Sequence, residues 1–91
     1  MKKIETTRQF DKDLKAIGLM PELIDVLHAL INNLPIAEKY KDHNLQGNLK
    51  KYRECHLKPD VLLAYQLTDD SVKLIATDNH NNLFKTLSNR E

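Results

Sequence analysis

The sequence lacks most of the features that mark secreted, membrane-spanning or zinc-stabilised proteins. Its one cysteine, Cys55, cannot close an intrachain disulfide, and no Cys-x-x-Cys pair offers a structural zinc site. No run approaches the roughly 20 apolar residues of a membrane span. The basic residues near the N-terminus are followed by no apolar segment of the kind found in signal peptides. These absences predict a protein of the reducing cytoplasm.

Glycine, proline and tryptophan are scarce too, with 2, 3 and 0 residues, whereas 41% of the residues are hydrophobic and 30% are charged. This composition is typical of a globular domain and excludes a disordered or collagen-like chain. A length of 91 residues allows about one hydrophobic core. We therefore expect a single domain over residues 1–91.

An excess of charge of one sign is also missing, because the formal net charge is +1. The chain as a whole therefore does not have the basic character of many nucleic-acid-binding proteins. The distribution is uneven, however: residues 39–58 contain six Lys or Arg against two acidic residues, and they include His43 and His56. This segment is either a surface that holds a phosphate backbone or a solvated basic face, and composition does not choose between them.

The hydrophobic pattern of the first half predicts a pair of helices. Apolar residues at helical spacing follow Thr6 or Thr7, which is the expected N-cap, and the first helix is expected to end at Gly18. A second helix begins at Pro21 and ends before Pro35. Its apolar stripe consists of Leu23, Leu27, Leu30, Ile31 and Leu34.

Four segments are strand-like, at residues 2–6, 50–57, 61–68 and 71–77, and the third is nearly all apolar, as a central strand would be. The turns between the last three are too short for parallel crossovers, so these strands form an antiparallel meander. The order strand–helix–helix–strand–strand–strand predicts an α+β domain, with both helices on one face of an antiparallel sheet and the other face open to a ligand. Before and after the meander we expect a long loop over residues 36–48 and a tail over residues 79–91 that frays at residues 88–91.

Histidines are the main candidates for chemistry, because the common nucleotide-, metalloprotease-, hydrolase- and calcium-binding motifs are absent. His43 lies in the expected loop, His56 and Asp60 flank a short turn, and His80 follows the last strand. Imidazoles serve as general acids or bases near neutral pH, and a carboxylate can orient them. His28 lies off the apolar stripe of its helix and is expected at the surface.

From the residues alone, three interpretations of these four side chains remain open. They form a shared catalytic site, they bind a metal such as zinc, or they are unrelated surface groups. The short ligand spacings of zinc sites are absent, which disfavours the metal.

Three segments resemble a known family: KDHNLQG at residues 41–47, YRECHLKPD at 52–60, and NHNNLF at 79–84. They are similar to the YafQ branch of the RelE/ParE superfamily, and the similarity extends over nearly the whole chain. Its members are toxins of bacterial type II toxin–antitoxin pairs that cut messenger RNA on the translating ribosome. The resemblance implies a RelE-like fold and a small antitoxin as partner, with a toxin–antitoxin complex that binds operator DNA through the antitoxin.

The resemblance also implies a catalytic set, namely His43, His56, Asp60 and His80, with no metal or other cofactor. The reaction is attack of a ribose 2′-hydroxyl on the adjacent phosphate, in which one group removes a proton and another protonates the departing 5′-oxygen. His80 or His56 is expected as the base, the other or His43 as the acid, and Asp60 as the group that orients an imidazole. The implied RNA contacts are Phe84, Lys41, Lys50, Lys51, Arg53 and Lys58, where Phe84 either stacks on a base or anchors the tail in the core.

Two positions depart from the family pattern: Ala76 stands where an arginine is usual, and Val61 where some relatives have tryptophan. Loss of one donor to a transition-state anion typically costs about 100–1000-fold in rate. Either Arg53, a nearby lysine or the ribosome supplies the charge, or the chain is a weakened toxin that mainly binds its antitoxin. A third alternative is a gyrase-directed toxin of the ParE kind, which shares the fold without needing the histidines.

Overall fold

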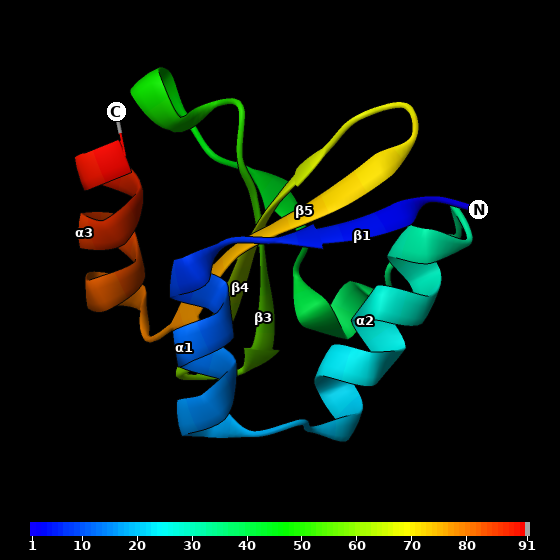
Figure 1. Cartoon of the computed structure of the whole chain (residues 1–91), viewed down its shortest axis with the longest axis horizontal. Helices are drawn as coiled ribbons and strands as arrows, with labels where there is room; N and C mark the ends of the chain where they lie inside the picture. Colours follow the sequence, from blue (N-terminus) through cyan, green and yellow to red (C-terminus); the bar gives the residue numbers. More distant parts are fainter. Residues whose placement is uncertain (91) are drawn as a thin grey trace.

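A five-stranded sheet in the order β1-β5-β4-β3-β2 forms the centre of the computed structural model, which describes residues 1–90 (Figure 1). The strands are β1 (Lys3–Thr6), β2 (His43–Asn44), β3 (Arg53–Lys58), β4 (Val61–Leu67) and β5 (Ser71–Asp78). The predicted antiparallel meander of β3, β4 and β5 is confirmed, with β4 at the centre. β1, however, pairs parallel with β5, so the sheet is mixed rather than antiparallel. No short turn joins these two strands, so no hairpin sets their relative direction.

One face of the sheet is covered by α1 (Arg8–Ile17) and α2 (Pro21–Ile31), as predicted. The Thr7 side chain caps α1 by accepting a hydrogen bond from the backbone N–H of Phe10 at 3.0 Å, and Gly18 ends the helix with a φ of 75°. The stripe of α2 is only partly as expected, because Leu34 lies beyond the helix and is exposed. Its buried residues are Leu23, Val26, Ala29 and Leu30.

The opposite face is not open, because the expected tail folds into a third helix, α3 (His80–Arg90). Figure 1 shows α2 and α3 on opposite sides of the central strands. Leu83 and Leu87 of α3 are buried against Leu62, Ala64 and Ile75. Residues 88–90, expected to fray, belong to this helix, and residue 91 lies outside the described residues. Within residues 1–90, no helix is long and apolar enough to cross a membrane.

The expected loop over residues 36–48 contains short ordered elements. They are η1 (Glu38–Tyr40), β2 and the start of η2 (Gly47–Leu49). Since η2 and a turn occupy residues 47–51, β3 begins three residues later than predicted. β2 pairs antiparallel with the start of β3, which places His43 opposite Glu54. This pairing brings a loop histidine onto the sheet.

Candidate active site

His43, Glu54 and His56 form a cluster on the α3 side of the sheet. His43 pairs with Glu54 across β2 and β3, and alternate residues of a strand share a face, so His56 lies beside them. The two imidazole centroids are 6.1 Å apart, and His43 Nε2 lies 3.5 Å from Glu54 Oε1. Candidate ligand atoms of the three residues all lie within 4.8 Å of one another.

The hydrogen-bond partners of His43 indicate which form of its imidazole this site suits. Its Nδ1 lies 2.8 Å from the backbone oxygen of Lys41, and a carbonyl only accepts, so this nitrogen donates. Its Nε2 faces the carboxylate of Glu54. With Nδ1 donating, the lone pair of a neutral ring lies on Nε2, the nitrogen on the side of Glu54.

Glu54 is the carboxylate of this site that the sequence interpretation missed. It is only 5% exposed, whereas Asp60, the expected orienting group, is exposed. Within residues 1–90, Asp60 makes no hydrogen bond to an imidazole. The i, i+2 spacing of Glu54 and His56 on a strand was the available signal, because it puts both on one face.

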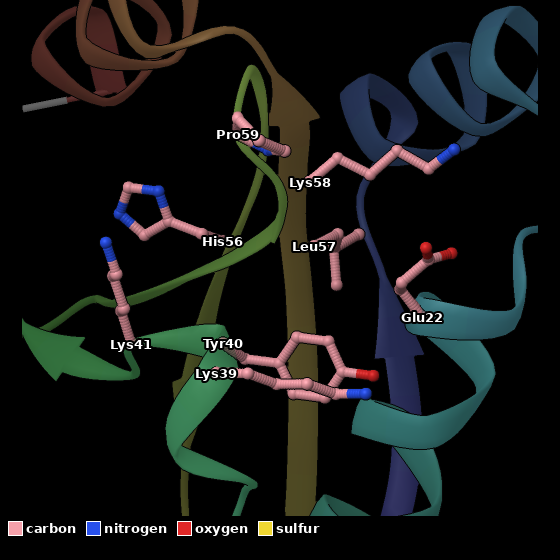
Figure 2. A pocket seen from close by; sticks show the side chains of 8 residues that line it. All are labelled: Glu22, Lys39, Tyr40, Lys41, His56, Leu57, Lys58 and Pro59. Carbon is pink, nitrogen blue, oxygen red and sulfur yellow. The ribbon is translucent and has the colours of Figure 1, made fainter.

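The imidazole of His56 is half-buried and lies on the wall of a cavity of about 440 Å³. Figure 2 shows the ring between Lys41 and the turn that contains Pro59. Lys41 and Lys58, both predicted RNA contacts, line the same cavity. Lys50 and Lys51, the other two predicted lysines, are exposed elsewhere, near η2.

Asp60 and His80 lie together on the other side of the turn. They line a second cavity of about 480 Å³ with Asn79 and Lys85, and Pro59 borders both cavities. Asn79 caps α3, since its Oδ1 accepts a hydrogen bond from the backbone N–H of Asn82 at 2.9 Å. The structure therefore brings the four predicted catalytic residues to one end of the sheet as two pairs, His43 with His56 and Asp60 with His80.

Comparison with known proteins adds the family. The model of a family described as "Bacterial toxin of type II toxin-antitoxin system, YafQ" matches residues 2–85. The chain belongs to the YafQ toxin family. It is 42% identical over 86 residues to the mRNA interferase toxin YafQ of Escherichia coli (strain K12), an alignment that covers 89% of this chain and 94% of that protein.

Solved structures of bacterial toxins, two of them containing YafQ, share this fold. YafQ from E. coli strain BL21(DE3) matches with a TM-score of 0.82 and 39% identity, over 92% of this chain and 99% of that one. A chain of the E. coli DinJ-YafQ toxin-antitoxin complex matches with a TM-score of 0.81 and 41% identity, over 91% and 97%. A metal-bound toxin from Helicobacter pylori matches with a TM-score of 0.83 and 46% identity, over 92% and 100%.

In this YafQ-family toxin, Arg53 is held by neighbouring side chains rather than directed at the histidines. Its Nη2 lies 2.5 Å from Asp42 Oδ2, and its Nε donates to the Tyr65 hydroxyl at 3.3 Å. The hydrogen bond to Asp42 raises the pKa of Arg53. Tyr65 belongs to the core on the α1–α2 side, opposite to the face that carries Glu54 and His56. Arg53 therefore contacts the opposite face of the sheet from Ala76, the position at which the family usually has its arginine.

Ala76, which stands at the arginine position, is 1% exposed beneath α3. The pairings Glu54↔Ala64 and Ala64↔Ala76 place it in the same row of the sheet as the His43 cluster. The cations that line the cavities beside the histidines are lysines. Lys39, Lys41 and Lys58 lie beside His56, and Lys85 lies beside His80.

Phe84 lies on the surface of α3. Phe84 is 58% exposed and lines a cavity of about 420 Å³ with His80, so it is not a core anchor. Leu83 and Leu87 have that role.

Cys55 is a buried strand residue, as predicted. Burial raises the pKa of its thiol to about 12. The thiol is therefore protonated at neutral pH and unsuited to nucleophilic attack.

Proposed function

We propose that this toxin is an endoribonuclease that cleaves messenger RNA on the translating ribosome, without a metal ion, and so stops translation. The observation that carries the proposal is the facing pair His43 and His56 with the buried carboxylate of Glu54, in a chain 42% identical to a protein named as an mRNA interferase. Ring nitrogens within 4.8 Å of one another can both contact a single phosphate group, given hydrogen bonds of roughly 2.7–3.2 Å.

The reaction is attack of a 2′-hydroxyl on the neighbouring phosphorus, which forms a 2′,3′-cyclic phosphate and releases a 5′-hydroxyl. His43, with Glu54 at its Nε2, gives a proton to the departing 5′-oxygen. His56 or His80 takes the proton of the 2′-hydroxyl. Both imidazoles are candidates, since each lines a cavity next to the turn that contains Pro59. Lysines of the two cavities offset the charge that develops on the phosphate.

The proposed partners follow the family. A structure of E. coli YafQ contains the antitoxin DinJ, and we propose that a small antitoxin likewise silences this chain in the cytoplasm. The ribosome and messenger RNA complete the active complex. Operator DNA is bound by the toxin–antitoxin complex through the antitoxin.

The chemistry is tested with a messenger RNA that carries a single 2′-deoxynucleotide at the mapped cleavage position. We expect the unmodified RNA to be cut on ribosomes, leaving a 5′-hydroxyl on the downstream fragment, and the modified RNA to resist cleavage there. Cleavage of the deoxy-substituted position at the normal rate would rule out 2′-hydroxyl attack. Growth inhibition with DNA-damage signalling and intact RNA would instead support a gyrase-directed toxin, and no inhibition at all a decayed one.

A second candidate property of the same site is metal binding by His43, Glu54 and His56. Two imidazoles and one carboxylate suit zinc or copper, and related H. pylori toxin structures are described as metal-bound and copper-bound. A bound ion would occupy the imidazole lone pairs that proton transfer requires. Added copper or zinc should therefore inhibit cleavage, and a chelator should restore it. A requirement for the ion would contradict the metal-independent proposal.

A further inference from the structure

The cavity beside His56 has features that proton transfer does not use. Its volume is about 440 Å³, and it lies between the first turn of α2, η1 and the end of β3. Figure 2 shows Glu22 on the far side of this cavity from His56. A group bound here would therefore lie next to His56, one of the two imidazoles proposed to contact the scissile phosphate.

Part of the cavity wall is apolar and fixed. Tyr40 and Leu57 line it, and both are buried. The Tyr40 hydroxyl donates to Asp25 Oδ2 at 2.7 Å, and this hydrogen bond raises the pKa of Tyr40 to about 12. The exposed part of this wall is narrow, because Tyr40 and Leu57 are 4% and 3% exposed and Lys39 Nζ lies 5.2 Å from the centroid of the Tyr40 ring. It suits contact with the edge of a planar base.

The charged lining is divided between one acid and several cations. Lys39, Lys41 and Lys58 are exposed at the cavity, whereas Glu22 is its one acidic lining residue. Glu22 Oε1 is buried, and it is the one buried side-chain polar atom of the described residues without a hydrogen-bond partner. Such atoms are rare in native proteins. A donor group on a bound ligand would satisfy this one once the Glu22 side chain turns the oxygen toward the cavity that it lines.

We propose that this cavity, the Glu22 cavity, binds one nucleotide of the substrate RNA adjoining the scissile phosphate. The base lies against Tyr40 and Leu57, and its amino group donates to Glu22, while the lysines hold the flanking phosphates. Adenine, cytosine and guanine present amino donors, whereas the one Watson–Crick donor of uracil lies between two carbonyl oxygens that a carboxylate repels. The cavity therefore selects against uracil. The inference rests on RNA being the substrate of the proposed function.

Binding can be measured without cleavage, by NMR titration of the full chain with AMP, CMP, GMP, UMP and ribose 5-phosphate. We expect the first three to shift the backbone amides of Glu22, Tyr40 and Lys58. UMP should bind about tenfold more weakly, the effect of roughly one hydrogen bond to a charged acceptor. Glu22→Gln should abolish this difference, because its amide can donate to a uracil carbonyl. Glu38→Gln, at an exposed carboxylate outside the cavity, is the matched control.

Equal binding of ribose 5-phosphate and AMP would reduce the cavity to a phosphate site and overturn the inference, as would the absence of shifts at these amides. Codon-resolved cleavage on ribosomes separates this inference from the proposed function. If the natural chain cuts and Glu22→Gln keeps the same codon preference, the inference fails and the function stands. If the nucleotides bind selectively but no RNA is cut, the nuclease proposal fails and the assignment of the bound nucleotide to substrate RNA fails with it, whereas the base selectivity of the cavity is established by the titration itself.

Discussion

At the scale of single residues, the role proposed for His43 depends on the carboxylate of Glu54. This carboxylate is buried and lies 3.5 Å from His43 Nε2. On β4, the residue paired with Glu54 is Ala64, which carries no charge. A carboxylate in this position is an acceptor for a proton carried on Nε2. Among the described residues 1–90, Asp60 has no such contact with an imidazole, and its orienting role stays a prediction.

Substitution of these residues should reduce cleavage without unfolding the protein. General acid catalysis contributes roughly 100–10,000-fold, so we expect His43→Gln to lose about that factor in the single-turnover rate and Glu54→Gln to lose part of it. Ribosome binding should be unchanged. Glu5→Gln, at an exposed carboxylate on β1, is the control. An unchanged rate in Glu54→Gln would remove Glu54 from the mechanism.

At the scale of elements, the two-residue strand β2 needs support, because a strand this short makes few hydrogen bonds of its own. Arg53 supplies that support from β3, since its guanidinium contacts Asp42 before β2 and Asn44 within it. The Tyr65 hydroxyl donates to Asp42 as well. The position of His43 therefore depends on side chains of the opposite face of the sheet.

Arg53→Lys distinguishes this positioning role from the RNA contact that the sequence predicted. Lysine keeps the positive charge but cannot contact two partners through a planar fork. If Arg53 positions β2, cleavage should fall by about tenfold or more, the cost of roughly one lost charged hydrogen bond, while binding to the ribosome is retained. If Arg53 mainly contacts a phosphate, both cleavage and ribosome binding should stay near their natural values.

Helix α3 combines a structural face with an exposed one. Leu87 is 1% exposed in the core beneath the helix, and a buried Leu→Ala change typically costs about 2–5 kcal/mol. We expect Leu87→Ala to lower the free energy of unfolding by that amount in urea denaturation. Phe84→Ala should change stability by less than about 0.5 kcal/mol, as at most surface positions, and still slow cleavage. A large loss of stability in Phe84→Ala would contradict its assignment to the RNA surface.

At the scale of the whole molecule, the sequence predicted those helices and strands whose ends or directions are set by residues close by in the chain. Thr7, Gly18 and Pro21 bound the first two helices as expected, and the short turns set the antiparallel meander. The direction of β1 was beyond such signals, because its partner β5 follows it by more than sixty residues. Helix α3 was indicated only weakly, by Asn79 as an N-cap and by Leu83 and Leu87 at i, i+4 spacing. Because one face of the sheet was expected to be open, no helix was predicted there.

The catalytic roles of the predicted site residues stay predictions, and only their placement in the fold can be compared with the sequence. The resemblance supplied the histidines of the site, and the fold places them at one end of the sheet. The positions of Glu54 and of the Arg53 side chain depend on how β2, β3 and β4 pair. A slip of one residue would move each side chain to the opposite face of the sheet, and no motif in this sequence specifies the pairing. The placement of side chains at this site is therefore set by pairing between strands as much as by residue type.

The most direct test of the central claim is cleavage of messenger RNA on purified translating ribosomes in the presence of a metal chelator. It compares the natural chain with His56→Ala, His80→Ala and the control His28→Ala, which alters an exposed histidine of α2. We predict cleavage by the natural chain and by His28→Ala, and a loss of roughly 100-fold or more in the other two variants. Cleavage that survives in both active-site variants, or intact RNA with the natural chain, would contradict a histidine-based messenger RNA nuclease.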